Sequence, residues 1–409
     1  MTKHTNTPEL RFPEFKDIWY IKQLEEIGTF KNGINKDKNS FGHGFPFINL
    51  NDVFNQDNIN INNLGLIDSS EKEREEYNLT KGDTLFIRSS VKPSGVGLTK
   101  VIQNDLINTV YSGFLIRFRE RKKFLEDNFK SYIFSSTSVR KQIISLSSTS
   151  ANTNINQDSL KKVQIVIPPL IEQAQIGIFF NKLDQQIELE EKKLELLEQQ
   201  KKGYMQKIFS QELRFKDENG NDYPDWEEKL VSDIGKVVTG NTPSKKENEY
   251  WNSNQYVWVT PSDISNKKNI SNSDYQLSQK GYEKARQLPK NTLLITCIAS
   301  IGKNAILRIE GSCNQQINAV IPNNNYDVDY LYYAFEEVSK LMKSIAGKTA
   351  TQIVNKGIFE KLILNVPIFD EQKKISDFLS KIDILIDMQS RKIERLKNRK
   401  KGLLQKMFV

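Results

Sequence analysis

Side chains that suit contacts with a nucleic acid gather in loops of both halves of this 409-residue chain. Lysine ammonium groups suit phosphates, whereas arginine, asparagine and glutamine present paired donors and acceptors to base edges. In the first half we predict a DNA-binding set of Lys31, Asn32, Lys36, Lys38, Arg88, Ser89, Ser90, Lys92, Lys100, Asn152 and Asn154. In the second half the predicted set is Thr242, Lys245, Lys246, Thr260, Ser262, Lys267, Lys268, Thr296, Ser300, Lys303, Gln315, Gln316, Lys348, Thr349 and Gln352. Surface exposure alone would explain any single member, so the prediction depends on their occurrence as sets in matching loops.

Groups for catalysis or metal binding are few. The two histidines, His4 and His43, do not stand with cysteines or carboxylates at metal-ligand spacing. The stretch Ser94 to Lys100 begins like a phosphate-binding loop but lacks the Gly-Lys-Ser/Thr ending, so a tight turn between strands is the better interpretation. The acids around Asp225 fall within one short turn, whereas carboxylates that share a metal usually come from converging strands. We therefore expect neither a catalytic site nor a metal or cofactor in this chain.

Composition is typical of a soluble protein of two or three domains. The formal charge of +8 favours a polyanionic partner, although such an excess is also common for solubility alone. Two cysteines, Cys297 and Cys313, fit a reducing compartment better than a disulfide scaffold. The longest apolar run, Leu293 to Ile301, is too short to cross a bilayer. We expect a cytoplasmic protein with no membrane partner.

A duplication supplies the long elements of the chain. Val163–Phe209 aligns without a gap on Leu362–Phe408. In both copies apolar residues recur at alternating spacings of three and four, the pattern of a coiled-coil helix. Both stripes are interrupted at equivalent places, Glu190/Gln389 and Lys201/Lys400, which indicates that the two helices pair. The alternative is that each helix packs separately on its own domain.

Shorter matches precede each helix. The matched stretches are Trp19–Gly33 with Trp226–Gly240, Phe45–Val53 with Tyr256–Ile264, and Asp83–Arg88 with Asn291–Thr296. These are strand-like runs bounded by glycine, proline and asparagine. One helix is predicted over Asp329–Ile345, and a final strand ends in a proline before each long helix. The loops differ between the halves, so we expect a shared scaffold that carries out similar tasks on two different targets.

The sequence thus predicts an α+β fold built twice. We expect two tandem recognition domains of mixed α and β structure at residues 1–168 and 212–367. Each is followed by a long helix, at 169–211 and 368–409. The two helices are predicted to pair as an antiparallel coiled coil.

In this order the features resemble the specificity subunits of type I restriction-modification systems over essentially the full length. The resemblance is carried by the tandem layout, by Pro168, Glu172 and Gln173 with their counterparts Pro367, Glu371 and Gln372, by the Trp258–Ile264 motif, and by the Gln-Lys-x-Phe helix endings. The first domain departs from the pattern at Ile48–Val53 and Thr149–Ile155, which makes site residues harder to carry over there.

The resemblance implies two target-recognition domains, each of which reads one half of a bipartite sequence in double-stranded DNA, with the helix pair as a spacer. Half-sites about 34 to 36 Å apart lie on one face of the duplex. Because the domains differ, we expect an asymmetric target. It also implies that two methyltransferase subunits, and often two restriction subunits, dock on this chain, and that S-adenosylmethionine, ATP and magnesium belong to those partners.

Two other functions remain open at this point. A stand-alone DNA-binding regulator would tolerate the same basic loops and paired helices without a docking surface. A self-contained methyltransferase-nuclease would require a glycine-rich cofactor loop and an Asn/Asp-Pro-Pro-aromatic motif, and neither occurs in the sequence.

Overall fold

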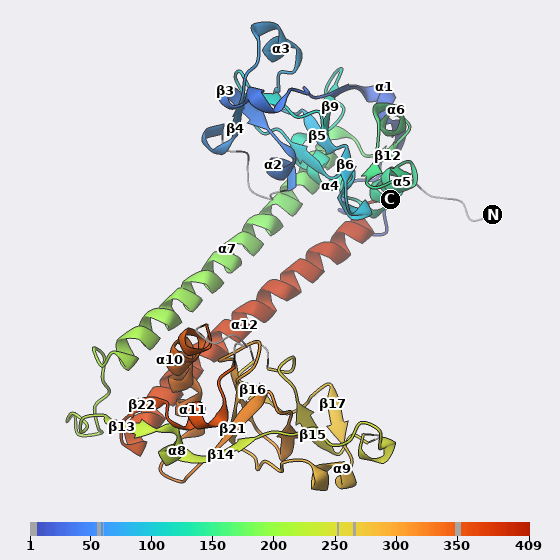
Figure 1. The fold of residues 1–409 in the computed structure, drawn as a ribbon. Coiled ribbons are helices and arrows are strands. Elements are labelled where there is room, and N and C mark those ends of the chain that lie inside the picture. The colour runs from blue at the N-terminus through green and yellow to red at the C-terminus, as the bar shows by residue number, and fades with distance from the viewer. Residues whose placement is uncertain (1–5, 55–58, 60, 252, 265–266, 348–352) are drawn as a thin grey trace. The chain divides into compact units, whose positions relative to one another are not determined.

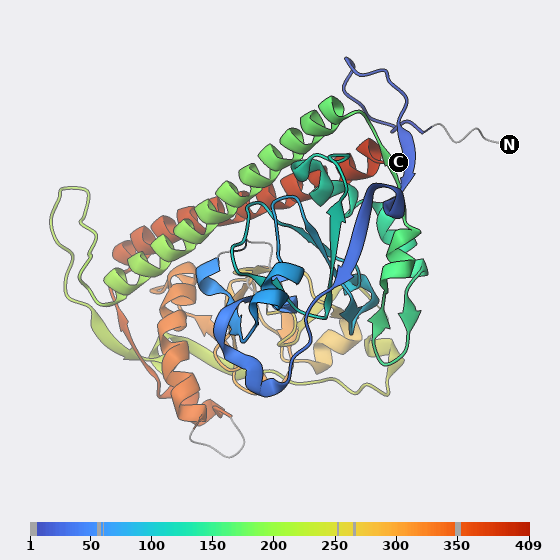
Figure 2. The ribbon, with the colours of Figure 1, turned by 90° about the horizontal axis from the view of Figure 1, so that it is seen from above.

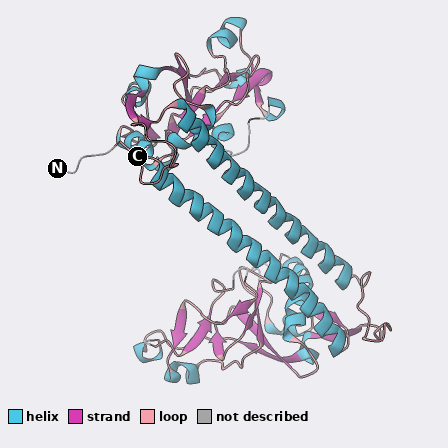
Figure 3. Cartoon of the chain, turned by 180° about the vertical axis from the view of Figure 1, so that it is seen from behind, coloured by secondary structure: helices cyan, strands magenta, loops and turns pink. Residues whose placement is uncertain are grey.

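The computed structural model describes residues 6–54, 59, 61–251, 253–264, 267–347 and 353–409. The chain forms two compact units: unit 1 holds residues 1–192 and 391–409, and unit 2 holds residues 193–390. The long helices α7 (Leu170–Phe209) and α12 (Phe369–Met407) each contribute to both units. Each unit mixes strands with helices (Figures 1, 2 and 3), as the sequence predicts.

Unit 1 is built on a four-stranded antiparallel sheet in the order β2-β9-β5-β7. Its strands are β1 (Tyr20–Gln23), β2 (Gly28–Asn32), β3 (Phe41–Ile48), β4 (Gly65–Ile67), β5 (Thr84–Ile87), β6 (Ser89–Ser90), β7 (Thr99–Val101), β8 (Val110–Tyr111), β9 (Leu115–Glu120), β10 (Ser148–Thr149), β11 (Thr153–Asn154) and β12 (Gln164–Ile167). Its shorter helices are α1 (Leu24–Ile27), α2 (Leu50–Phe54), α3 (Glu71–Glu76), α4 (Asp127–Ile133), α5 (Thr137–Ser145) and α6 (Gln157–Lys161), with 3-10 turns η1 (Lys38–Ser40), η2 (Ile61–Asn63) and η3 (Pro93–Gly95). Further sheets are β4-β3-β8, β10-β11-β6 and β1-β12.

Unit 2 repeats this plan with a five-stranded sheet in the order β14-β21-β18-β19-β16. Its strands are β13 (Glu227–Leu230), β14 (Gly235–Thr239), β15 (Tyr256–Val259), β16 (Asn269–Ile270), β17 (Tyr275–Leu277), β18 (Thr292–Thr296), β19 (Asn304–Leu307), β20 (Gly311–Cys313), β21 (Ile317–Pro322) and β22 (Ile363–Val366). Its shorter helices are α8 (Val231–Ile234), α9 (Gln279–Lys284), α10 (Val328–Ala346) and α11 (Lys356–Glu360), with the 3-10 turn η4 (Asn248–Tyr250). The predicted helix over Asp329–Ile345 is confirmed as α10, which Asp327 caps by accepting backbone N–H bonds from Asp329 and Tyr330.

A buried glutamate fixes the start of each long helix in the same way. Glu172 is 0 % exposed, and Arg11 Nε donates to its Oε1 at 2.7 Å. Glu371 is equally buried, and Arg214 Nη2 donates to its Oε2 at 2.7 Å. A tryptophan indole N–H also donates to each carboxylate. Because a buried charge must be paired, the duplicated Glu, Trp and Arg positions are explained together.

The two long helices pair within each unit, and the predicted antiparallel direction is confirmed. In unit 1 Asp184 pairs with Lys400, and Glu190 pairs with Lys392, so numbers rise along α7 as they fall along α12 (Figures 1 and 2). In unit 2 Lys201 Nζ lies 2.8 Å from Asp383 Oδ1. The shared interruptions of the two apolar stripes at Lys201 and Lys400 are therefore equivalent salt-bridge positions, and the alternative of two separately packed helices is wrong.

The end of each long helix completes the core of a unit. Phe408 lies 5.5 Å from Phe129 and 6.0 Å from Phe180, measured between ring centroids, in the core of unit 1. In unit 2 Phe209 lies 6.0 Å from Tyr330. These contacts give the repeated Gln-Lys-x-Phe endings a packing role.

One sequence match is wrong by a single residue. The match of Asp83–Arg88 with Asn291–Thr296 sets Ile87 against Ile295. The matched glycines Gly28 and Gly235 pair with the last residues of β9 and β21, so the first residues of these strands, Leu115 and Ile317, are equivalent. Ile87 pairs with Leu115 and Thr296 pairs with Ile317, so Ile87 is equivalent to Thr296. The correct match makes Phe86 equivalent to Ile295. Each of these side chains faces the core beneath the helices of its own unit. A shift of one residue would turn each side chain to the opposite face of the sheet.

Candidate nucleic-acid interface

Each unit carries a turn that leaves the middle of its main sheet and is closed by a glycine. In unit 1 the chain runs from β5 through β6 and η3, and Gly97 returns it to β7 with φ +64°. In unit 2 Gly302 closes the turn between β18 and β19 with φ +81°. A Cβ on Gly97 would meet Ile143 Cγ2 at 2.4 Å, so glycine is required by conformation and by space. The stretch Ser94 to Lys100 is thus confirmed as a turn between strands.

The turn in unit 1 borders a cavity of about 540 Å³. Its lining is Leu50, Phe54, Ser89, Ser90, Val91, Lys92, Ser94, Gly95, Leu98, Phe114 and Asn152. Four predicted site residues are in this set: Ser89, Ser90, Lys92 and Asn152. Strand β11 pairs with β6, which brings the Asn152 loop beside the serines. Hydroxyl, amide and ammonium groups therefore surround a mostly apolar wall.

The other predicted residues of unit 1 lie outside that lining. Lys31 and Lys36 are ion-paired with Glu76 and Glu73 of α3, at 2.8 and 2.7 Å. The lysine partners lower the pKa of both glutamates. Of the remaining predicted residues, Asn32 lies on β2, Lys38 on η1, Lys100 on β7 and Asn154 on β11. The guanidinium of Arg88 donates a hydrogen bond to Gly113 O. Four members of the first set therefore line this cavity, and the others lie elsewhere in unit 1.

The equivalent turn in unit 2 borders a smaller cavity of about 350 Å³. Ala299, Ser300, Ile301, Lys303, Lys343, Ala346 and Gly347 line it. Ser300 and Lys303 were predicted, whereas Lys343 was missed. Its place in the last turn of α10 could be read from the helix pattern, but the pattern does not show that this turn meets the Ser300 loop. Thr296 is buried and holds the turn, because its Oγ1 accepts from the Lys303 N–H at 3.0 Å.

Two further side-chain contacts in unit 2 each bring a pair of predicted residues together. Thr242 Oγ1 donates to Gln315 Oε1 at 2.7 Å, which sets a predicted hydroxyl beside a predicted amide. Thr260 and Ser262 share a hydroxyl contact at 2.7 Å. Lys245, Lys246 and Lys267 are exposed, while Lys348, Thr349 and Gln352 lie outside the described residues.

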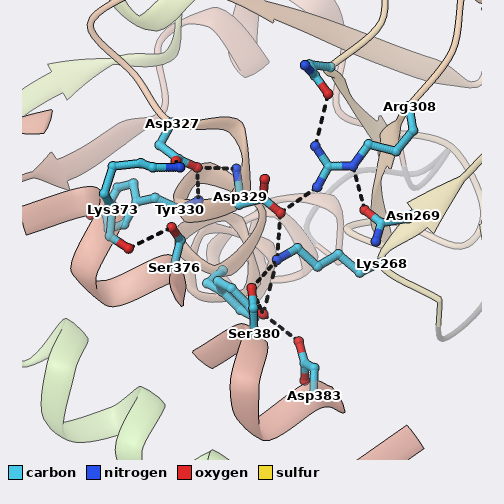
Figure 4. Close-up of polar contacts among 12 residues, drawn as sticks. Lys268, Asn269, Arg308, Asp327, Asp329, Tyr330, Lys373, Ser376, Ser380 and Asp383 are labelled. Carbon is cyan, nitrogen blue, oxygen red and sulfur yellow. Dashed lines mark hydrogen bonds and ion pairs between the residues drawn. The ribbon is translucent and has the colours of Figure 1, made fainter. Parts of the chain in front are cut away.

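Lys268 is placed differently from the prediction, because its side chain points into unit 2 (Figure 4). The ammonium lies 2.8 Å from Asp329 Oδ1 and donates to Ser380 Oγ at 2.9 Å and to Tyr333 Oη at 3.2 Å. Only 12 % of the side chain is exposed, and burial lowers the pKa of Lys268. The residue ties the start of β16 to α10 and α12, so we leave it out of the interface.

The loops before β9 and β21 have the same backbone hydrogen bonds in both units. The Ser112 N–H donates to Ile48 O at 2.9 Å, and the Asn314 N–H donates to Val259 O at 3.0 Å. Phe114 O and Gln316 O each accept one backbone N–H from the segment that follows the central strand, β5 or β18. Phe114 therefore occupies the position of Gln316. Phe114 is not in the predicted set, because the offset of 202 that relates β9 to β21 is visible only in the pairing of these strands with β2 and β14.

Other chemistry is sparse in the described part of the chain. There, no group of three or more histidine, cysteine or acidic side chains could hold a metal ion. Burial raises the pKa of the Cys297 and Cys313 thiols to about 12, so both stay protonated at neutral pH. Over the same residues, every helix is too short or too polar to span a bilayer.

The comparisons with known proteins match type I specificity domains and subunits. The model of the family described as type I restriction modification DNA specificity domain matches residues 16–199 and again 223–398. The MjaIX specificity subunit of Methanocaldococcus jannaschii is 32% identical over 208 residues, 49% of this chain and 48% of its own, so this chain spans about half of that relative. The putative MjaX specificity subunit of the same organism is 23% identical over 100% of this chain and 96% of its own.

Two solved structures share the fold. The S subunit of a type I restriction-modification system from M. genitalium has a TM-score of 0.59 at 16% identity, over 98% of this chain and 99% of that one. A chain from a structure of type I R-M complex assembly and conformational transition has a TM-score of 0.62 at 14% identity, over 95% and 97%.

Proposed function

Because the chain belongs to the family of type I restriction-modification DNA specificity domains, we propose that it selects the DNA target of such a system. We propose target-recognition domains at residues 1–168 and 212–367, each of which reads one half of a bipartite target. The observation that supports this most strongly is one backbone scaffold, with the same hydrogen bonds, that holds different side chains in the two units. The two half-sites are therefore unlike, and the target is asymmetric.

The proposed contacts divide by chemistry. Ser89, Ser90 and Asn152 in unit 1, and Thr242, Gln315 and Gln316 in unit 2, offer hydroxyl and amide groups to base edges. Exposed lysines of the two units contact phosphates, which fixes the register of the protein on the duplex. Those lysines are Lys38, Lys92, Lys245, Lys246, Lys267, Lys303 and Lys343.

The helix pair is proposed to space the two domains and to hold the partner subunits. Exposed apolar side chains on the helices support a docking role: Leu189 and Leu196 on α7, and Ile384, Leu385 and Met388 on α12. We propose two methyltransferase subunits and two restriction subunits as partners. Catalysis, S-adenosylmethionine, ATP and magnesium are assigned to them, and the assembly works in the cytoplasm, where its DNA is found.

The test is to assemble this chain with its methyltransferase and to map every adenine methylated in a genome where it is the sole specificity determinant. We expect one motif of two unlike blocks separated by unread base pairs. Ser300→Ala together with Lys303→Ala relaxes or weakens one block only, whereas Lys340→Ala, an exposed residue ion-paired with Glu337, changes neither. A single contiguous palindrome would overturn the bipartite proposal. A chain that binds its target equally well without a methyltransferase would instead be a stand-alone regulator.

A further inference from the structure

The two units differ most sharply at one equivalent pair of positions. In unit 2 the loop before β21 carries Gln315 and Gln316, and Gln315 accepts a hydrogen bond from Thr242. In unit 1 the same loop carries Gly113 and Phe114, held by the same backbone bonds. An amide that can pair with a base edge is therefore replaced by an aromatic ring.

Phe114 does not pack into the core of unit 1. The side chain is 56 % exposed and stands on the wall of the cavity, where Val91 is 81 % exposed. Leu50, Phe54 and Leu98 continue this apolar surface. Large apolar side chains gathered around one opening indicate a site that a ligand covers.

The polar rim restricts what that ligand is. Ser89, Ser90 and Asn152 offer hydrogen bonds beside the apolar wall, and the ammonium of Lys92 favours a negatively charged partner. A base edge that combines hydrogen-bonding groups with a methyl group, on a phosphate backbone, meets all three requirements. In the major groove only thymine presents such a methyl group, at C5, and phenylalanine is among the side chains that contact it.

We propose that Phe114 and Val91 recognise the C5-methyl group of a thymine in the half-site read by the first domain. The inference depends on the proposed DNA-reading function and extends it to a base type and a named contact. At the equivalent position the second domain uses the amide chemistry of Gln316, so the two half-sites are read in different ways.

The test replaces thymine by deoxyuridine, which removes the methyl group and keeps the base pairing. The complete complex with its methyltransferase binds synthetic duplexes in which the thymines of one half-site, then of the other, are deoxyuridine. Loss of one buried methyl contact corresponds to about fourfold weaker binding. We expect that loss in the half-site whose base preference changes in Phe114→Gln.

Three variants separate methyl recognition from other effects. Phe114→Gln copies the second domain and is expected to bind thymine and deoxyuridine duplexes equally. Phe114→Leu keeps an apolar contact and retains the difference. Ile107→Gln removes an apolar side chain that is 76 % exposed but does not line the cavity, and it leaves the ratio unchanged.

Several outcomes would overturn the inference. One is bipartite binding that is insensitive to deoxyuridine in both half-sites, or a first half-site made of G·C pairs alone. Another is a Phe114→Gln variant that keeps the full thymine preference, or one that instead loses its methyltransferase, since the cavity would then hold a protein side chain. In each of these cases bipartite DNA selection survives, whereas failure of the proposed function would appear as no sequence-selective binding at all.

Discussion

Replacing Lys268 or Lys303 should separate a structural lysine from a DNA-contacting one in the same unit. Lys268 is 12 % exposed and lies against Asp329, Ser380 and Tyr333, whereas Lys303 is exposed and lines the cavity beside the turn between β18 and β19. We expect Lys303→Ala to reduce the slope of log K against log salt concentration by about 0.9, the value for one phosphate contact. We expect Lys268→Met to leave that slope unchanged.

The cost of Lys268→Met should appear in stability instead. Methionine fills the space of the aliphatic stem, so no large cavity forms. Asp329 loses one charged partner but keeps the guanidinium of Arg308 at 2.5 Å. Tyr333 keeps its bond to Asp383. The remaining loss is about 1–2 kcal/mol in the free energy of unfolding.

The assay is binding of the complete complex to its target between about 50 and 200 mM salt, with urea unfolding of each variant. Lys340→Ala is the matched control, because its ammonium is exposed and paired with Glu337 on the outside of α10. A Lys268→Met variant that lowers the salt slope as much as Lys303→Ala does would refute the structural role of Lys268, since the ammonium would then reach a phosphate.

Three further predictions concern buried side chains and the pairing of the two long helices. Phe408→Ala should lower the free energy of unfolding by about 3–5 kcal/mol, because the ring is buried against Phe129 and Phe180; a loss under 1 kcal/mol in urea titrations would contradict this packing role. Asp184→Lys should destabilise the chain by about 1–2 kcal/mol, through repulsion from Lys400 and loss of the hydrogen bond that Tyr132 Oη donates to Asp184, and adding Lys400→Asp should restore the ionic part; melting curves that show no recovery would argue against the pair. With a pKa near 12, about one thiol in 10⁴ is ionised at pH 8, so iodoacetamide should label Cys297 and Cys313 slowly in the folded chain and rapidly in urea; equal rates would refute their burial.

The long helices and the duplication were predictable because their signals are local and repeated. The apolar spacing predicted a helix at residues 169–211, and α7 runs from Leu170 to Phe209. The shared interruptions at Lys201 and Lys400 correctly indicated pairing, since a charged residue interrupts both stripes where it meets a carboxylate of the other helix. An apolar periodicity that continues over many helical turns leaves little doubt about which face of the helix is apolar.

The candidate site was predictable only as a set of loops. Ser89, Ser90, Lys92 and Asn152 do line one cavity, as do Ser300 and Lys303. Lys31 and Lys36 gave the same sequence signal but are paired with glutamates of α3. The sequence around a loop lysine does not show whether the folded chain will place a carboxylate beside it.

The sequence by itself determined the internal duplication, the extent of the long helices and the family, because each of these follows from the order and spacing of residues along the chain. Only the tertiary structure decided which residue of β5 corresponds to which residue of β18. It also decided the burial of Lys268 and the exposure of Phe114. Strand β5 is buried on both faces, so no alternation of polar and apolar residues sets its phase. Lys268 and Phe114 owe their environments to contacts with residues distant in the chain, and such contacts exist only once the sheets and helices have assembled.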